Sequence, residues 1–168
     1  FGYNALSANT TSSSNTAVGH NAMAANTTGE NNTAVGLNAL DGNTTGTRNT
    51  TIGYNSQTNS TTGNNNTTCG ADTMVSLSTG HDNTALGAYA LNSISTGSNS
   101  VGIGVSALEA NSTASGNTAI GWHSQMRTTT GSGNISVGQN TLENITTAND
   151  NTAIGNAVLF NSTASENT

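Results

Sequence analysis

The sequence predicts an all-β fold, a parallel β-solenoid of stacked coils, and three observations lead to it. A glycine recurs every 17 residues along the 168-residue chain, without one insertion from the first to the tenth. Apolar residues, Asn and Thr recur at fixed distances from that glycine. The apolar residues do not follow the three-and-four spacing of a helix, and Gly or Asn interrupts every few residues. Such a fixed period indicates structural repeats that stack in register.

The recurring glycines are expected to form one column of the stack, where an added side chain would disturb the next coil. We call this set the glycine column: Gly2, Gly19, Gly36, Gly53, Gly70, Gly87, Gly104, Gly121, Gly138 and Gly155. The pattern predicts a single array of about ten coils over residues 1–168, as a segment of a longer fibre.

Two apolar columns flank these glycines. The residue before each glycine is apolar in all ten repeats, so we expect that column to be buried, with Cys69 as a small core side chain. The residue four after the glycine is large and apolar in eight of ten repeats, which predicts a second buried column. Gln57 and Gln125 are its exceptions, and their amides could pair along the stack. The residue three after the glycine is small or β-branched.

Two polar columns are predicted to act as structural ladders. Asn stands four residues before the glycine in eight of nine repeats, as at Asn32 and Asn83. Stacked Asn side chains can hydrogen-bond amide to amide along the array. Thr stands eight residues before the glycine in nine of nine repeats, as at Thr28, Thr45 and Thr62, and always follows Thr or Ser.

Each repeat has room for two or three short strands. Residues 32–36 form a β-branched segment, and a turn, a small-residue segment to Leu40 and a segment around Thr44 follow it. Since each coil advances about 4.8 Å, ten coils would make a rod of roughly 48 Å. Residues 161–165 copy residues 111–115 at a spacing one short of three periods, so the last repeat has lost one residue.

Composition excludes several classes of function. The net charge is −6, and Arg48 and Arg127 are the only basic residues besides His. These are too few to neutralise phosphates, so we expect no nucleic-acid partner, and no apolar run is long enough for membrane insertion. His20, His81 and His123 occupy three different repeat positions, which predicts no metal site. The pattern contains no catalytic constellation, so we expect no enzyme and no cofactor.

The residue directly after the glycine varies freely, which predicts an exposed column. Tyr54 and Trp122 lie in it, with Tyr3 and with Tyr89 one residue further on. Exposed aromatic rings of this kind can stack on sugars or contact a receptor protein. The alternative is that they are scattered surface residues of a spacer that binds nothing.

Ladders of Thr and Ser also raise the alternative of ice or surface binding by a monomeric solenoid or a filament subunit. The two hydroxyl columns are adjacent in sequence, as at Thr44 and Thr45. Neighbouring residues of a strand face opposite sides, so these columns cannot form a two-column flat array unless the backbone bends between them.

The phrase N-T-A-[VI]-G-x-N-A-L, as in residues 32–40, resembles the head repeats of trimeric autotransporter adhesins and the shaft repeats of phage-type tail fibres. The resemblance covers all ten repeats, and the 17-residue period favours the tail-fibre branch. It implies a left-handed parallel β-roll in a homotrimeric fibre, outside the cell on a cell or virion surface. The expected function is attachment or spacing, with self-association and a glycan or cell-surface receptor as partners.

Overall fold

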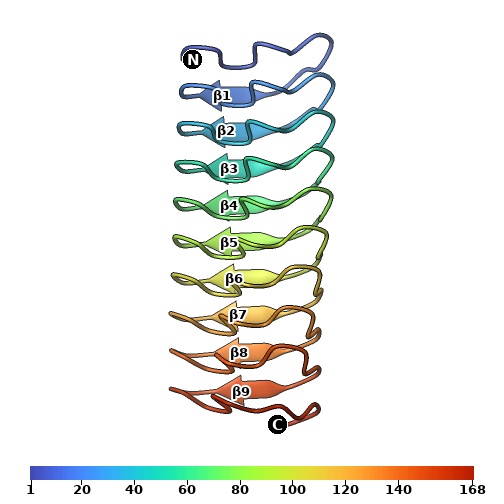
Figure 1. Cartoon of the computed structure of the whole chain (residues 1–168). Coiled ribbons are helices and arrows are strands. Elements are labelled where there is room, and N and C mark those ends of the chain that lie inside the picture. Colours follow the sequence, from blue (N-terminus) through green and yellow to red (C-terminus); the bar gives the residue numbers. More distant parts are fainter.

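The computed structural model describes all 168 residues and shows a straight stack of closely similar coils, with the chain termini at opposite ends (Figure 1). Nine strands form a single parallel sheet in which neighbours in sequence are neighbours in space. The strands are β1 (Thr16–Val18), β2 (Thr33–Val35), β3 (Thr50–Ile52), β4 (Thr67–Cys69), β5 (Thr84–Leu86), β6 (Val101–Ile103), β7 (Thr118–Ile120), β8 (Ile135–Val137) and β9 (Thr152–Ile154). Every pair is in register at an offset of 17 residues, as Ala34 opposite Ala17, which confirms the predicted stack.

Each coil contains one three-residue strand, where two or three strands were expected. Non-glycine residues with positive φ interrupt the remainder of the coil, for example Asn38 (55°) and Leu40 (54°). A left-handed residue turns the backbone out of an extended strand. Backbone hydrogen bonds still join these turns to the next coil, as from Leu40 N to Ser56 O (3.0 Å) and from Thr44 N to Thr61 O (3.0 Å).

The glycine column lies where an added side chain would meet the backbone of the next coil. Its members have φ between 120° and 145°, a region that side-chain-bearing residues rarely adopt. A Cβ atom on Gly36 would lie 2.3 Å from the carbonyl oxygen of Gly53. Both the backbone conformation and the space therefore require glycine here.

Small residues line the inner side of the sheet. The middle residue of every strand is buried, as are the residues three and four after the glycine away from the two ends of the stack. This confirms the predicted column of large residues, with Met23, Leu40, Leu91 and Leu108 fully buried. Gln57 and Gln125 also lie fully inside.

The prediction of a buried column directly before the glycine is wrong. Ile52 is 42% exposed and Ile154 is 70% exposed, and Cys69 is exposed rather than a core side chain. Alternate residues of a strand point to opposite sides of a sheet. Because the middle residue of each strand points into the coil, its first and third residues point out.

A further buried column was not predicted from the sequence. The residue seven after the glycine is fully buried from Asn26 to Ile145, with Leu77 and Ile94 at its centre. The apolar core is divided into three clusters, centred on Leu40, Leu91 and Leu142. The coils of Gln57 and Gln125 separate them.

The two glutamines do not pair with each other along the stack. Gln57 Oε1 accepts a hydrogen bond from Thr51 Oγ1 (2.8 Å), and Gln57 Nε2 donates to Ser60 Oγ (3.3 Å). Gln125 Nε2 donates to Ser136 Oγ (2.9 Å). Hydroxyl groups near its own coil thus pair with both ends of the Gln57 amide, whereas Gln125 Oε1 is buried without a partner.

The last coil is one residue shorter than the others, as the sequence predicts. Asn167 N donates to Asn151 Oδ1 (3.0 Å) across a separation of 16 residues, where the same bond elsewhere spans 17. The deletion therefore shortens a turn, and the Asn ladder continues across it.

Candidate functional site

The Asn column forms the predicted structural ladder. Asn49 donates from its backbone N (2.9 Å) and from Nδ2 (3.1 Å) to Asn32 Oδ1. The same Nδ2 also donates to Gly63 O in the following coil (2.8 Å). Asn83 repeats this arrangement on Asn66. These buried amides hold the coils together and leave nothing to bind a ligand.

The two hydroxyl columns have different roles. The hydroxyl of the residue eight after the glycine donates to the backbone carbonyl of the equivalent residue in the next coil. Examples are the bonds from Thr27 Oγ1 to Thr44 O (2.9 Å) and from Thr44 Oγ1 to Thr61 O (2.9 Å). The next residue, which includes Thr28, Thr45 and Thr62, is exposed in every repeat. The inter-coil bonds thus belong to the preceding residue, and Thr28, Thr45 and Thr62 form a solvent-facing ridge along one edge.

The outer face of the sheet is a flat array of Thr and aliphatic side chains. We call outer face the first and third residues of the strands: Thr16, Val18, Thr33, Val35, Thr50, Ile52, Thr67, Cys69, Thr84, Leu86, Val101, Ile103, Thr118, Ile120, Ile135, Val137, Thr152 and Ile154. Every one is exposed or half-buried, and none carries a charge. Columns within the face repeat about every 4.8 Å, and the two columns are about 6.8 Å apart.

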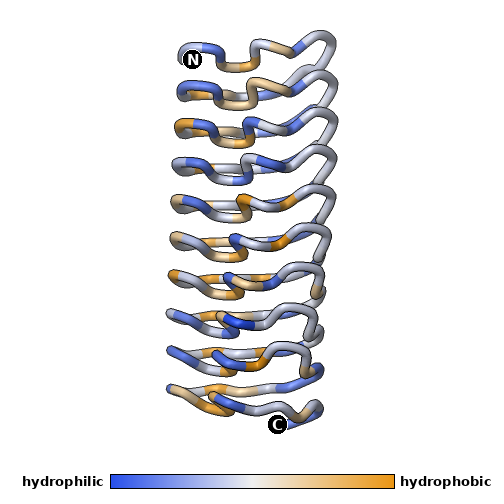
Figure 2. Tube along the Cα trace, in the orientation of Figure 1, coloured by the Kyte–Doolittle hydropathy of each residue, from blue (hydrophilic) through white to orange (hydrophobic).

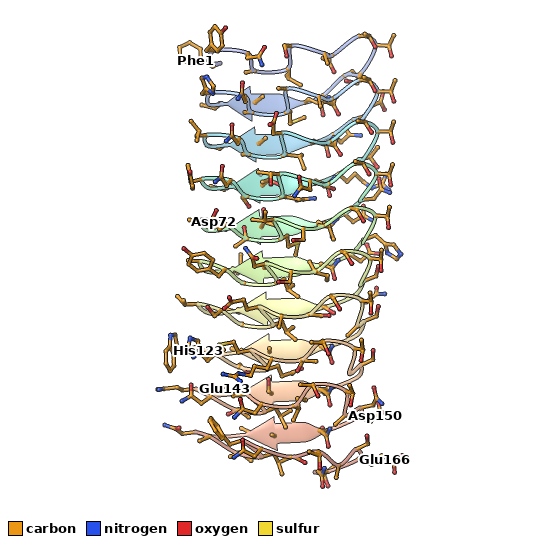
Figure 3. The ribbon with its side chains drawn as sticks, viewed as in Figure 1. Phe1, Asp72, His123, Glu143, Asp150 and Glu166 are labelled. Atoms are coloured by element: carbon orange, nitrogen blue, oxygen red, sulfur yellow. The ribbon has the colours of Figure 1, made fainter.

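Aromatic side chains gather at the edge that follows the glycine column. We call aromatic edge the exposed side chains Tyr3, Tyr54, Tyr89 and Trp122, which are all the Tyr and Trp residues of the chain. Two histidines lie beside them: Tyr3 stacks on His20 and Trp122 stacks on His123, with ring centroids 5.3 Å and 3.6 Å apart. Figure 3 shows His123 at this edge, opposite the edge that carries Asp150. The exposed positions predicted for Tyr54 and Trp122 are confirmed.

The third histidine lies at the opposite edge, in a short polar network. His81 Nδ1 and Asp82 Oδ2 are 2.8 Å apart, and Asn65 Nδ2 donates to Asp82 Oδ1 (2.9 Å). Arg48 Nε donates to Asn65 Oδ1 (2.6 Å). The hydrogen bonds from His81 and Asn65 hold the pKa of Asp82 below its usual value. This network follows one surface column of the stack and encloses no cavity.

No group of three or more His, Cys, Asp or Glu side chains could hold a metal ion. One hollow is present, near the last coil, and the six residues that line it, Asn144, Thr146 and Ser162 among them, include no titratable side chain. The structure has no helix with the length and apolar character needed to cross a bilayer.

Comparison with known proteins adds no relative. No family model matches the chain, and neither a curated protein nor a solved structure matches it. What the chain does must be argued from its own geometry.

The outer face was not foreseen from the sequence, although one signal for it is present. The middle residue of the strands is always small, Ala, Thr, Gly or Ser, whereas the third residue is larger in every strand except β4, where Cys69 follows Thr68. In a narrow coil the small residue belongs inside. The size difference between these neighbours, rather than hydrophobicity alone, predicts which one faces the solvent.

Proposed function

We propose that the chain is a non-enzymatic segment of a fibre, in which three copies pack in parallel along their outer faces. The observation that carries the proposal is the column of aliphatic side chains, Ile52, Ile120 and Ile154 among them, that lies exposed along a flat sheet. A continuous apolar surface on a folded chain typically marks an interaction site.

Packing along this face would remove a regular strip of apolar surface from water. The nine strands stacked about 4.8 Å apart give the strip a length of about 43 Å. Burial of apolar surface contributes about 25 cal/mol per Å². The uncharged Thr column beside it can be covered without desolvating a charge. The number three rests on the resemblance of the repeats to trimeric fibres.

The other surfaces suit an extended spacer. A polar edge of Thr, Ser, Gly and Asn runs the length of the stack and appears pale or blue at the right of Figure 2. A rod of this kind, left-handed as in the fibres it resembles, would hold another segment away from a cell or virion surface. Its working place is accordingly outside the cell.

The solution mass of the chain tests this proposal, measured by light scattering coupled to size exclusion. We expect three times the chain mass of 16.7 kDa, with a β-type circular dichroism spectrum. The double variant Ile103→Asp, Ile120→Asp should keep that spectrum and fall to the single-chain mass, because buried carboxylates would separate the chains. A matched control, Thr28→Asp with Thr62→Asp, places the same charges on the solvent-facing ridge and should leave the mass unchanged. A folded wild-type chain of 16.7 kDa would refute the fibre proposal.

One observation favours ice binding by a monomer as the second candidate. The objection to the hydroxyl columns at Thr44 and Thr45 does not apply to Thr33 and Val35, which point to the same side of β2. The outer face is thus a two-dimensional array of methyl and hydroxyl groups with constant spacings. If the chain is monomeric, thermal hysteresis that is lost on Thr84→Asp would support this candidate, and its absence in the wild type would remove it.

A further inference from the structure

The aromatic edge has a spacing that the spacer role does not require. Three of its rings stand in alternate coils, those of Gly53, Gly87 and Gly121: Tyr54, Tyr89 and Trp122, with 53%, 47% and 45% exposed. Coils are about 4.8 Å apart, so the coils that carry successive rings are about 9.6 Å apart along the rod. Tyr89 stands one residue further from its glycine than Tyr54 and Trp122. Ala71 and Val105, which carry no ring, follow the glycine in the coils between them.

We propose that this edge binds an extended, neutral, β-linked glycan strand that lies along the rod, with Tyr54, Tyr89 and Trp122 stacking in turn on every second sugar. His123 stacks on one face of Trp122, so Trp122 would use its other face. In an extended β-1,4-linked chain successive rings are flipped, so every second ring presents the same face at the distance of one disaccharide. The two-coil spacing of the platforms matches that repeat. Aromatic rings bind the C–H face of a sugar as they bind other apolar surfaces.

Polar groups between the first two platforms can serve the sugar hydroxyls. Asn55 Oδ1 accepts from Asn38 Nδ2 (2.9 Å), whereas Asn55 Nδ2 makes no hydrogen bond within the chain. Asp72 lies at the same edge one coil further on (Figure 3), with no hydrogen-bond partner for its carboxylate. Together they offer one donor and one acceptor beside the stacking surface.

The charge of the edge selects for a neutral strand. The two arginines lie elsewhere, since neither Arg48 nor Arg127 belongs to the columns one or two after the glycine. In the two columns that carry Tyr54, Tyr89 and Trp122, Asp72 is the only Asp, Glu, Lys or Arg residue. A polyanionic glycan or a nucleic acid would therefore meet a negative charge and no cation to neutralise it.

The test titrates the full chain with cellohexaose and with chitohexaose, two extended β-1,4-linked oligomers, by calorimetry and by the fluorescence of Trp122. We expect saturable binding of at least one of them and none of maltohexaose, whose α-linkages coil the chain. Tyr89→Ala removes the central platform and should weaken binding by about fivefold or more. Tyr3→Ala is the matched control, because Tyr3 lies in the same edge but three coils from Tyr54, outside the two-coil repeat.

Three results would overturn the proposal: no saturable binding of either β-linked oligomer, equal binding of maltohexaose, or a loss on Tyr3→Ala as large as that on Tyr89→Ala. Circular dichroism verifies that each variant is folded. The solution mass, which tests the fibre, should not change in Tyr89→Ala. Failure of the glycan site and failure of the fibre are thus separate results.

Discussion

The inner and outer faces of the nine-stranded sheet are made by adjacent residues of the same short strands, yet they obey different rules. On the inner face Ala85 is fully buried, and next to it Leu86 on the outer face is half-buried only. The interior is narrow: a Cβ on Gly102 would lie 3.2 Å from Leu91 Cγ on the opposite wall. The space inside the coil decides which side chain points inward, so the larger apolar residues are placed on the outer face.

The glycine column lies beside both faces of the sheet. A substitution in this column should lower the stability of the chain more than any other change considered below. In Gly87→Val the added Cβ would lie 2.7 Å from the carbonyl carbon of Gly104, at a φ of 120°. We expect the free energy of unfolding to fall by about 3 kcal/mol or more, read from thermal or urea denaturation. Gly116→Asn is the control, because the space around Gly116 is open and Asn99 stands at the same repeat position with positive φ. An unchanged melting temperature in Gly87→Val would show that the column is not sterically required.

A pair of variants in β5 separates the two faces directly. Ala85→Leu adds volume to the packed interior and should cost about 1–3 kcal/mol of coil stability. Leu86→Ala, one residue away on the outer face, should change the stability of the single coil stack little and should weaken association. The measurement is denaturation together with the concentration dependence of the melting temperature. Equal losses from both variants would contradict the assignment of the two faces.

Most polar side chains in the interior have a hydrogen-bond partner, and Asn111 is an exception. Both amide atoms of Asn111 are buried without a hydrogen bond, whereas in Asn43 only Oδ1 lacks a partner and Nδ2 donates to Asn26 Oδ1 and to Gly46 O. A Cβ on Gly46 would lie 2.4 Å from Asn43 Oδ1, and in the coil of Asn111 the corresponding residue is Ala114. The methyl group of Ala114 therefore takes the place that the amide needs.

Asn111→Ile should accordingly stabilise the chain by about 1–2 kcal/mol, since an unpaired buried amide costs about that much. Ile145 is fully buried in this column with Ala148 three residues after it, as Ala114 follows Asn111, so isoleucine fits beside an alanine here. Asn43→Ile should destabilise, because it breaks two hydrogen bonds. If chemical denaturation shows the same loss for both variants, the difference between the two amides has no energetic meaning.

The smallest effect is expected at Asp41, on the wall opposite the sheet. Burial raises the pKa of this carboxyl above its ordinary value of 3.8, and bonding to Ala24 and the charge of His20 oppose the rise only in part. A raised pKa in the folded chain means that the ionised form disfavours folding above that pKa, and the penalty disappears below the unfolded value. Asp41→Asn should therefore stabilise at pH 7, by under about 1 kcal/mol because the group is partly solvated, and should have no effect near pH 3. A larger gain in the free energy of unfolding at pH 3 than at pH 7 would contradict a raised pKa of Asp41.

Much of the fold could be predicted because the same residue types recur at the same positions of each repeat. The period, the buried column around Leu40, the Asn ladder at Asn32 and the exposed position of Tyr54 all follow from residue types at fixed spacing. The positive φ of Leu40, which limits each coil to one strand, could not be predicted, since nothing in a leucine indicates it.

The sequence also did not predict which of two neighbouring strand residues points into the coil and which points to the solvent. Cys69 and Thr68 are both compatible with either side of β4, and the narrow interior, which is a property of the whole coil, decides between them. For the same reason the sequence did not show which of Thr44 and Thr45 bonds to the next coil and which faces the solvent.

Cys69 permits the most direct test of the central claim, that the outer face is covered by other copies of the chain. It is the only cysteine and it lies on the outer face, in β4, near the middle of the sheet. The measurement is the rate at which a maleimide labels Cys69 in the native chain, compared with the Ile103→Asp, Ile120→Asp variant. We predict labelling at least tenfold slower in the native chain, because in the fibre the thiol is buried between chains. Equal rates in the two proteins would show that the outer face is open to solvent and would contradict the fibre.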